Sequence, residues 1–86
     1  MPRVFIPPRA RKLAGCEFAD IDAGSVRAVI SRLEEQFPGI ADCLLQDGEI
    51  RSGISVSVGG RVSGMGLYQK VGPGDEVHFI PAIGGG

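Results

Sequence analysis

Apolar residues follow a helical period in one part of the chain and alternate with polar residues in another. Between residues 26 and 37 they recur at the three- and four-residue spacing of a single helix face, at Val26, Val29, Ile30, Leu33 and Phe37. Ser25 precedes this stretch as a candidate N-cap, and Pro38-Gly39 follow it as a stop signal. The pattern predicts one amphipathic helix that lies on a sheet and exposes a charged outer face.

Strict alternation over Ile54–Val58 predicts the clearest strand, with Ile54, Val56 and Val58 on one buried face. Shorter apolar runs predict further strands at residues 4–6, 16–21, 61–62 and 76–80. We expect turns at residues 12–15, at Gly59-Gly60 and at residues 71–75. Residues 40–45 read as one helical turn and residues 46–49 as a loop.

The last predicted strand is apolar on both faces, which is typical of a central strand with a neighbour on each side. An N-terminal hairpin, a helix, a second hairpin and a final central strand make up the β-grasp arrangement. The expected fold class is therefore α+β, a ubiquitin-like β-grasp with a mixed sheet of four to five strands and one main helix. Residues 1–82 would form this domain, and residues 83–86 a flexible glycine tail.

Composition narrows the class of protein. The chain has 86 residues, of which 43% are hydrophobic, and this suits one small domain with its own core. The net charge of −1 and the scattered basic residues argue against a nucleic-acid partner. The proline-broken N-terminus fits neither a signal peptide nor a membrane span, so we expect a cytoplasmic protein with no membrane partner. Cys16 and Cys43 are far apart beside a single histidine, which predicts free thiols and no metal site.

The chain ends in Ile83-Gly84-Gly85-Gly86, directly after the last predicted strand. A backbone without Cβ atoms can lie extended in a narrow channel and present its terminal carboxylate there. No triad or acid–base pair is evident elsewhere, so we expect no catalytic residues in this chain. The glycine clusters match no phosphate-binding motif, which indicates that the chain itself binds no nucleotide. The competing interpretation is that terminal glycines are merely tolerated.

Several segments resemble the ThiS/MoaD family of ubiquitin-like sulfur carriers, most strongly Gly74-Asp75-Glu76-Val77 and the ending from Pro81 to Gly86. The resemblance implies that an E1-like partner adenylates the carboxylate of Gly86 with ATP. A sulfur donor then converts it to a thiocarboxylate, and a sulfur-accepting synthase is the second partner. Within the tail motif, Gly85 would give clearance and Gly84 spacing. No cofactor would be bound, and the free chain would be a monomer.

Partner docking is expected next to the tail. Val77 and Phe79 should face the helix, which turns His78 and Ile80 to the opposite side of the sheet. The resemblance places a hydrophobic contact at Ile80, and Pro81, Ile83 and His78 complete the expected docking residues. Alternatively, a loop of the chain itself covers Ile80. Pro7 departs from related carriers, which often have an aromatic residue on this face.

The sequence leaves the function open in two ways. The sulfur could serve molybdopterin, cysteine, thiamine or another metabolite, with three segments closer to cysteine-synthesis carriers of the CysO type: residues 28–34, 66–67 and 81–82. The same activated tail could instead form an isopeptide bond to a lysine, which would make the chain a protein modifier. A third alternative is a β-grasp interaction module whose glycines have no chemical role.

Overall fold

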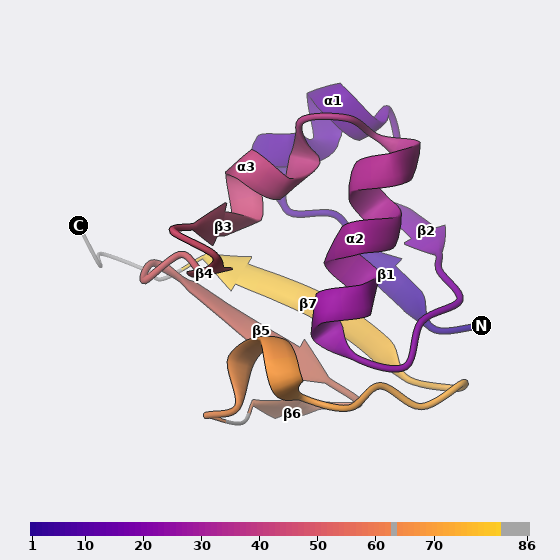
Figure 1. Cartoon of the computed structure of the whole chain (residues 1–86). Coiled ribbons are helices and arrows are strands. Elements are labelled where there is room, and N and C mark those ends of the chain that lie inside the picture. The colour runs from indigo at the N-terminus through magenta and orange to yellow at the C-terminus, as the bar shows by residue number, and fades with distance from the viewer. Residues whose placement is uncertain (63, 82–86) are drawn as a thin grey trace.

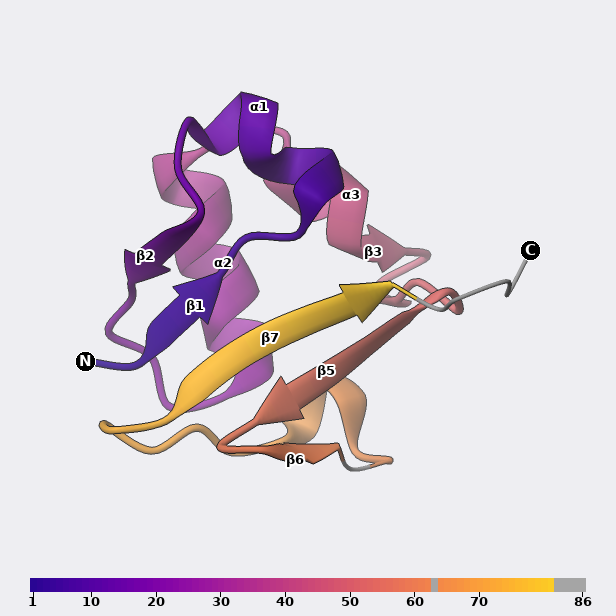
Figure 2. The ribbon, with the colours of Figure 1, turned by 180° about the vertical axis from the view of Figure 1, so that it is seen from behind.

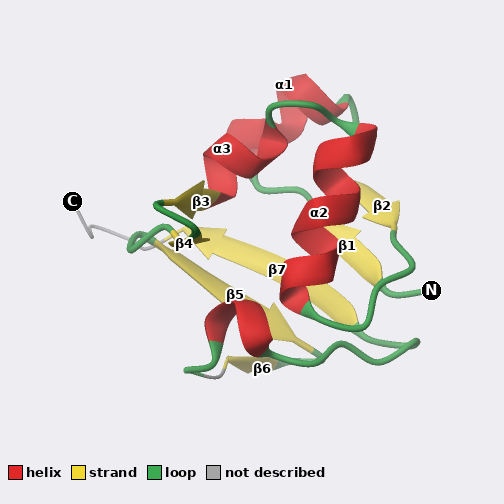
Figure 3. Ribbon diagram, viewed as in Figure 1, coloured by secondary structure: helices red, strands yellow, loops and turns green. Residues whose placement is uncertain are grey.

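The computed structural model describes residues 1–62 and 64–81, which form a mixed sheet covered on one side by helices (Figures 1 and 3). The sheet has five strands in the order β2-β1-β7-β5-β6. Their bounds are β1 Arg3–Phe5, β2 Phe18–Asp20, β5 Ile54–Val58, β6 Arg61–Val62 and β7 Glu76–Pro81. The β-grasp prediction is confirmed, with one main helix, α2 (Val26–Gln36), on the sheet.

Strand β7 lies in the middle of the sheet, parallel to β1 and antiparallel to β5 (Figure 2). The register pairs Val77 with Val4 and with Val58, and Phe79 with Val56. All of these side chains are buried. The prediction of a central last strand is therefore confirmed, and its apolar character follows from its two neighbours.

Helix α2 begins where the sequence predicted. The Ser25 side chain accepts a hydrogen bond from the backbone N–H of Ala28 at 3.1 Å, as an N-cap does. Val26, Val29, Ile30 and Leu33 are buried against the sheet, which confirms the predicted apolar face. The helix ends at Gln36, and Phe37 is its C-terminal cap.

The predicted turn at residues 12–15 is wrong. The chain instead forms a 3-10 helix, η1 (Pro8–Ala10), followed by a short helix, α1 (Arg11–Ala14). Pro8 sits at the first helical position, where its fixed φ and missing N–H favour a helix start. Gly15 ends α1 with a φ of 73°. The second strand is three residues long, which is shorter than the predicted stretch of residues 16–21.

The segment after α2 is more ordered than predicted. The expected helical turn is helix α3 (Ile40–Leu44), but residues 46–49 are not a simple loop. Strands β3 (Leu45–Gln46) and β4 (Glu49–Ile50) form a two-stranded antiparallel sheet around Asp47 and Gly48. Both turn residues have positive φ, at 55° and 79°, as a type I′ hairpin requires.

The same geometry at Gly59 and Gly60 confirms the predicted tight turn between β5 and β6. A last 3-10 helix, η2 (Gly66–Tyr68), follows β6.

Candidate docking site at the end of the central strand

The fold places the last described residue, Pro81, at the end of the central strand β7. Residues 82–86 follow directly in the sequence. The predicted tail residues Ile83, Gly84, Gly85 and Gly86 lie outside the described residues, as does the predicted domain boundary after residue 82. Of the expected site, the structure therefore describes the docking residues His78, Ile80 and Pro81.

Residues of β7 alternate between the two faces of the sheet as predicted. Val77 and Phe79 are buried in the core, whereas Ile80 is 43% exposed and His78 is half-buried. The alternative that the described part of the chain covers Ile80 is therefore wrong. Ile80 therefore adds exposed apolar area to the open face of the sheet, next to the end of the central strand.

Aromatic rings line up across three strands on the same face as His78. Phe5 of β1 is paired in register with His78, and their rings stack with centroids 4.2 Å apart and planes 7° apart. Phe18 of β2 is paired with Phe5 on the other side, at 5.9 Å and a tilted angle of 47°. We call Phe5, Phe18, His78 and Ile80 the docking face. It combines exposed apolar area with rigid rings, as protein interfaces commonly do.

Charged groups border the docking face on one side. The Arg3 guanidinium lies 4.3 Å from the centre of the Phe18 ring and 3.2 Å from the Asp20 carboxylate. Glu76 Oε1 lies 3.4 Å from Nε2 of His78. The charged groups Arg3, Asp20 and Glu76 therefore lie at the edge of the face.

The expectation about Pro7 needs correction. Pro7 is buried and caps η1, so it does not lie on the docking face. The aromatic position on that face belongs to Phe5, which the sequence reasoning missed along with Phe18. The available signal was the period of two in β1, because a buried Val4 turns Phe5 outward.

The described residues offer little for other chemistry. No group of three or more histidine, cysteine, aspartate or glutamate side chains in them is arranged to hold a metal ion. Cys16 and Cys43 are free thiols, and both are half-buried. None of the described helices is long and apolar enough to cross a bilayer.

Comparisons with known proteins identify similar sequences and similar folds. The ThiS family model matches residues 4–86. Small archaeal modifier protein 3 of Haloferax volcanii is 33% identical over 67 residues, which are 76% of this chain and 73% of that protein. A chain in the crystal structure of the Amycolatopsis orientalis BexX/CysO complex superposes with a TM-score of 0.89 at 28% identity and covers 100% of both chains. Mycobacterium tuberculosis CysO gives a TM-score of 0.88 at 26% identity, covering 96% of this chain and 100% of its own.

Proposed function

This chain belongs to the ThiS family, and from that premise we propose that it is a sulfur carrier whose working group is the carboxylate of Gly86. The observation that carries the proposal is the position of β7. The central strand β7 ends at Pro81, five residues before Gly86, and two residues of the docking face, His78 and Ile80, belong to the same strand. This arrangement suits a chain end that is presented to a partner while the domain is held beside it.

The proposed chemistry needs activation, because a carboxylate at neutral pH is a poor electrophile. In the first step, a Gly86 carboxylate oxygen attacks the α-phosphate of ATP, which gives an acyl adenylate and releases pyrophosphate. In the second, hydrosulfide attacks the acyl carbon, the C–O bond to AMP breaks and AMP leaves, and loss of the thiol proton leaves a thiocarboxylate. ATP and the sulfur donor are handled by the partner enzyme, and the carrier contributes the acyl group and no catalyst. Gly85 leaves room for the approach of a catalytic site.

The proposal implies two protein partners in the cytoplasm. An E1-like adenylating enzyme would bind the docking face and thread the tail, and a sulfur-accepting synthase would later do the same. A small apolar face with a polar border suits partners that bind one after the other, because a partner held by a small interface dissociates readily. This chain is similar to CysO, whose crystal structure in complex with BexX supports a carrier that acts inside a complex. The free carrier would be a monomer, and among biosynthetic routes the resemblance to CysO favours cysteine.

Adenylation can be tested by isotope exchange. E1-like enzymes from the same genome would be incubated with the carrier, ATP and labelled pyrophosphate. We expect label to return to ATP only with a chain that ends in Gly86, because the exchange reverses the first step. A chain lacking Gly86 is the matched control. Equal exchange with both chains would contradict the proposal.

A second candidate function is protein modification, which the 33% identity to small archaeal modifier protein 3 favours. The amine of a lysine would then attack the acyl carbon of the adenylate. AMP would leave, and an isopeptide bond would form. Such conjugates would survive thiol treatment in cell lysates and disappear when Gly86 is deleted. If the thiocarboxylate forms and no such conjugates are found, the chain is a sulfur carrier and not a protein modifier.

A further inference from the structure

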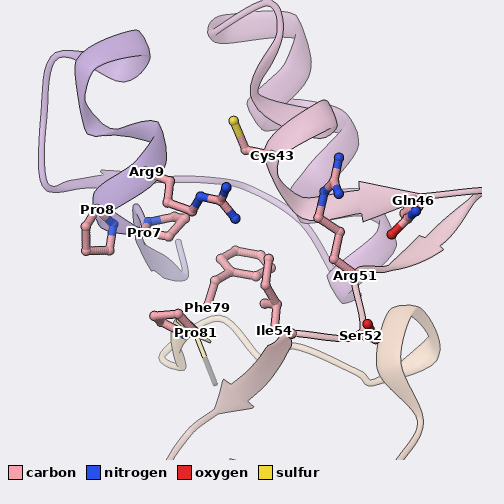
Figure 4. Close-up of a pocket in the computed structure, with 11 residues that line it drawn as sticks. Pro7, Pro8, Arg9, Cys43, Gln46, Arg51, Ser52, Ile54, Phe79 and Pro81 are labelled. Atoms are coloured by element: carbon pink, nitrogen blue, oxygen red, sulfur yellow. The ribbon is translucent and has the colours of Figure 1, made fainter. Parts of the chain in front are cut away.

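A groove with a volume of about 210 Å³ opens beside Pro81 (Figure 4). Phe79 and Pro81 line it, and because they alternate along β7 with His78 and Ile80, the groove lies on the other side of the strand from the docking face. Its apolar wall is formed by Pro7, Ile54, Phe79 and Pro81, and its other lining residues include Arg9, Cys43 and Arg51. This volume is below the roughly 300–1,000 Å³ of typical small-molecule sites. The groove is therefore better matched to an inserted side chain than to a cofactor.

The rim of the groove is positively charged in a chain whose net charge is −1. Arg9 and Arg51 reach the opening from opposite sides of the Phe79 ring (Figure 4). Arg51 is held in place, because its Nε and Nη2 donate to the backbone carbonyl of Asp42 at 3.0 and 2.9 Å. The Arg9 guanidinium has no hydrogen bond or ion pair to any residue that the structure describes. A neighbouring hollow shares Arg9, Cys43 and Arg51 and adds Asp42, so cations outnumber the one carboxylate along this rim.

The position of the groove determines what can cover it. Five residues follow Pro81, and even a fully extended chain of that length spans only about 17 Å. An enzyme that holds Gly86 in its active site must therefore lie close to Pro81 and to the groove beside it. Partner surfaces that meet paired guanidinium groups are expected to carry carboxylates.

We propose that this groove is a second docking site, which receives from the adenylating enzyme an apolar side chain flanked by a carboxylate. The inference rests on the proposed function, since it assumes an enzyme that threads the tail. The apolar side chain packs on Phe79, Ile54 and Pro81, and the carboxylate pairs with Arg9. The docking face and the groove then hold β7 from both sides, which fixes the direction in which the tail leaves.

Charge reversal at the rim tests the proposal. Arg9→Glu is preferred over a change at Arg51, because the Arg51 guanidinium also bonds the α3 backbone. Arg27→Glu is the matched control, since Arg27 is exposed on α2 and lines no part of the groove. Affinity for the enzyme that charges the wild-type chain would be measured at low and high salt. We expect Arg9→Glu to weaken binding about tenfold or more at low salt, less at high salt, and Arg27→Glu to change it by less than about twofold.

A thiol footprint gives a second readout without substitution. Cys43 lines the groove, whereas Cys16 lies before β2 and lines no part of it, and both are half-buried. Alkylation of each thiol by iodoacetamide would be followed by mass spectrometry, with and without the enzyme. We expect the enzyme to slow labelling of Cys43 and to leave Cys16 unchanged.

The outcomes separate this inference from the proposed function. If the chain is charged but Cys43 stays unprotected and Arg9→Glu binds like the wild type, the groove proposal is wrong and the carrier function stands. If no enzyme charges the wild-type chain, both are overturned. If Cys43 in the free protein is labelled faster after residues 82–86 are deleted, the chain's own tail occupies the groove, which also overturns the proposal.

Discussion

At the scale of single residues, Glu34 links helix α2, in which it lies, to the start of helix α3. Its carboxylate accepts hydrogen bonds from the backbone N–H of Gly39, at 3.1 and 2.9 Å, and from that of Ala41, at 2.9 Å. These N–H groups open helix α3 and have no partner within it. The hydrogen bonds from Gly39 and then Ala41 hold the pKa of Glu34 below its ordinary value of 4.5.

This lowered pKa predicts how stability changes with pH. A carboxyl with a depressed pKa in the folded state stabilises the fold above its unfolded pKa, and the effect is lost as pH falls through the folded pKa. Urea unfolding should show the wild type to be more stable than Glu34→Gln at about pH 7, and this difference should disappear as the pH falls through the folded-state pKa of Glu34. The difference should begin to shrink below 4.5. A difference that stays constant down to the lowest pH would contradict the assignment.

Phe5 is the residue on which the docking face depends most. It stacks on His78 and contacts Phe18, so its removal breaks both ring contacts. Phe5→Ala should raise the KM for charging by about threefold to tenfold, while leaving kcat at saturation unchanged, because truncating an apolar side chain at an interface commonly costs about 1 kcal/mol of binding. Tyr68→Ala serves as control, since Tyr68 is 72% exposed and lies outside the face. A loss of kcat with unchanged KM would assign Phe5 a different role.

At the scale of elements, the start of helix α2 tests the link between sequence and structure. The Ser25 hydroxyl satisfies one N–H of the first turn. Ser25→Ala should lower the free energy of unfolding by about 1 kcal/mol, whereas Ser31→Ala, on the exposed helix face, should be neutral or slightly stabilising. Denaturant unfolding of both variants measures this. Equal losses would mean that Ser25 does not act as the cap.

Long, regular elements could be predicted from the sequence, and short ones could not. Helix α2 and strand β5 present several periods of apolar residues. Strands β3 and β4 are two residues long, so no alternation can be seen in them, and only the Asp47-Gly48 pair signalled a hairpin. In η1, Pro8 begins a helix shortly after the first strand, although a proline at this place in the sequence could equally mark only the end of that strand.

At the scale of the whole molecule, the candidate site depends on pairing between distant segments. Phe5 and Phe18 lie near the N-terminus and His78 near the C-terminus, and the parallel pairing of β1 with β7 brings them together. The alternation within β7 could be predicted from that strand alone. The row of rings could not, because the pattern within β1 or β7 does not tell which distant strand it pairs with.

In the molecule as a whole, the end of strand β7 at Pro81 lies between two surfaces. The docking face lies on one side of β7, and the groove beside Pro81 lies on the other. The core residues Val77 and Phe79 anchor that strand, so the domain can hold its position while residues beyond Pro81 enter a partner. Under the proposed function, the stable sheet holds these two surfaces in place while the chemistry takes place at Gly86.

The central claim is that Gly86 receives sulfur, and an intact mass tests it most directly. The chain would be incubated with ATP, a sulfur donor and an enzyme that supports pyrophosphate exchange, next to a chain lacking Gly86. We predict a gain of about 16 Da, sulfur in place of oxygen, on the C-terminal fragment of the full chain only. An unchanged mass with an enzyme that forms the adenylate, or an equal gain without Gly86, would contradict the account.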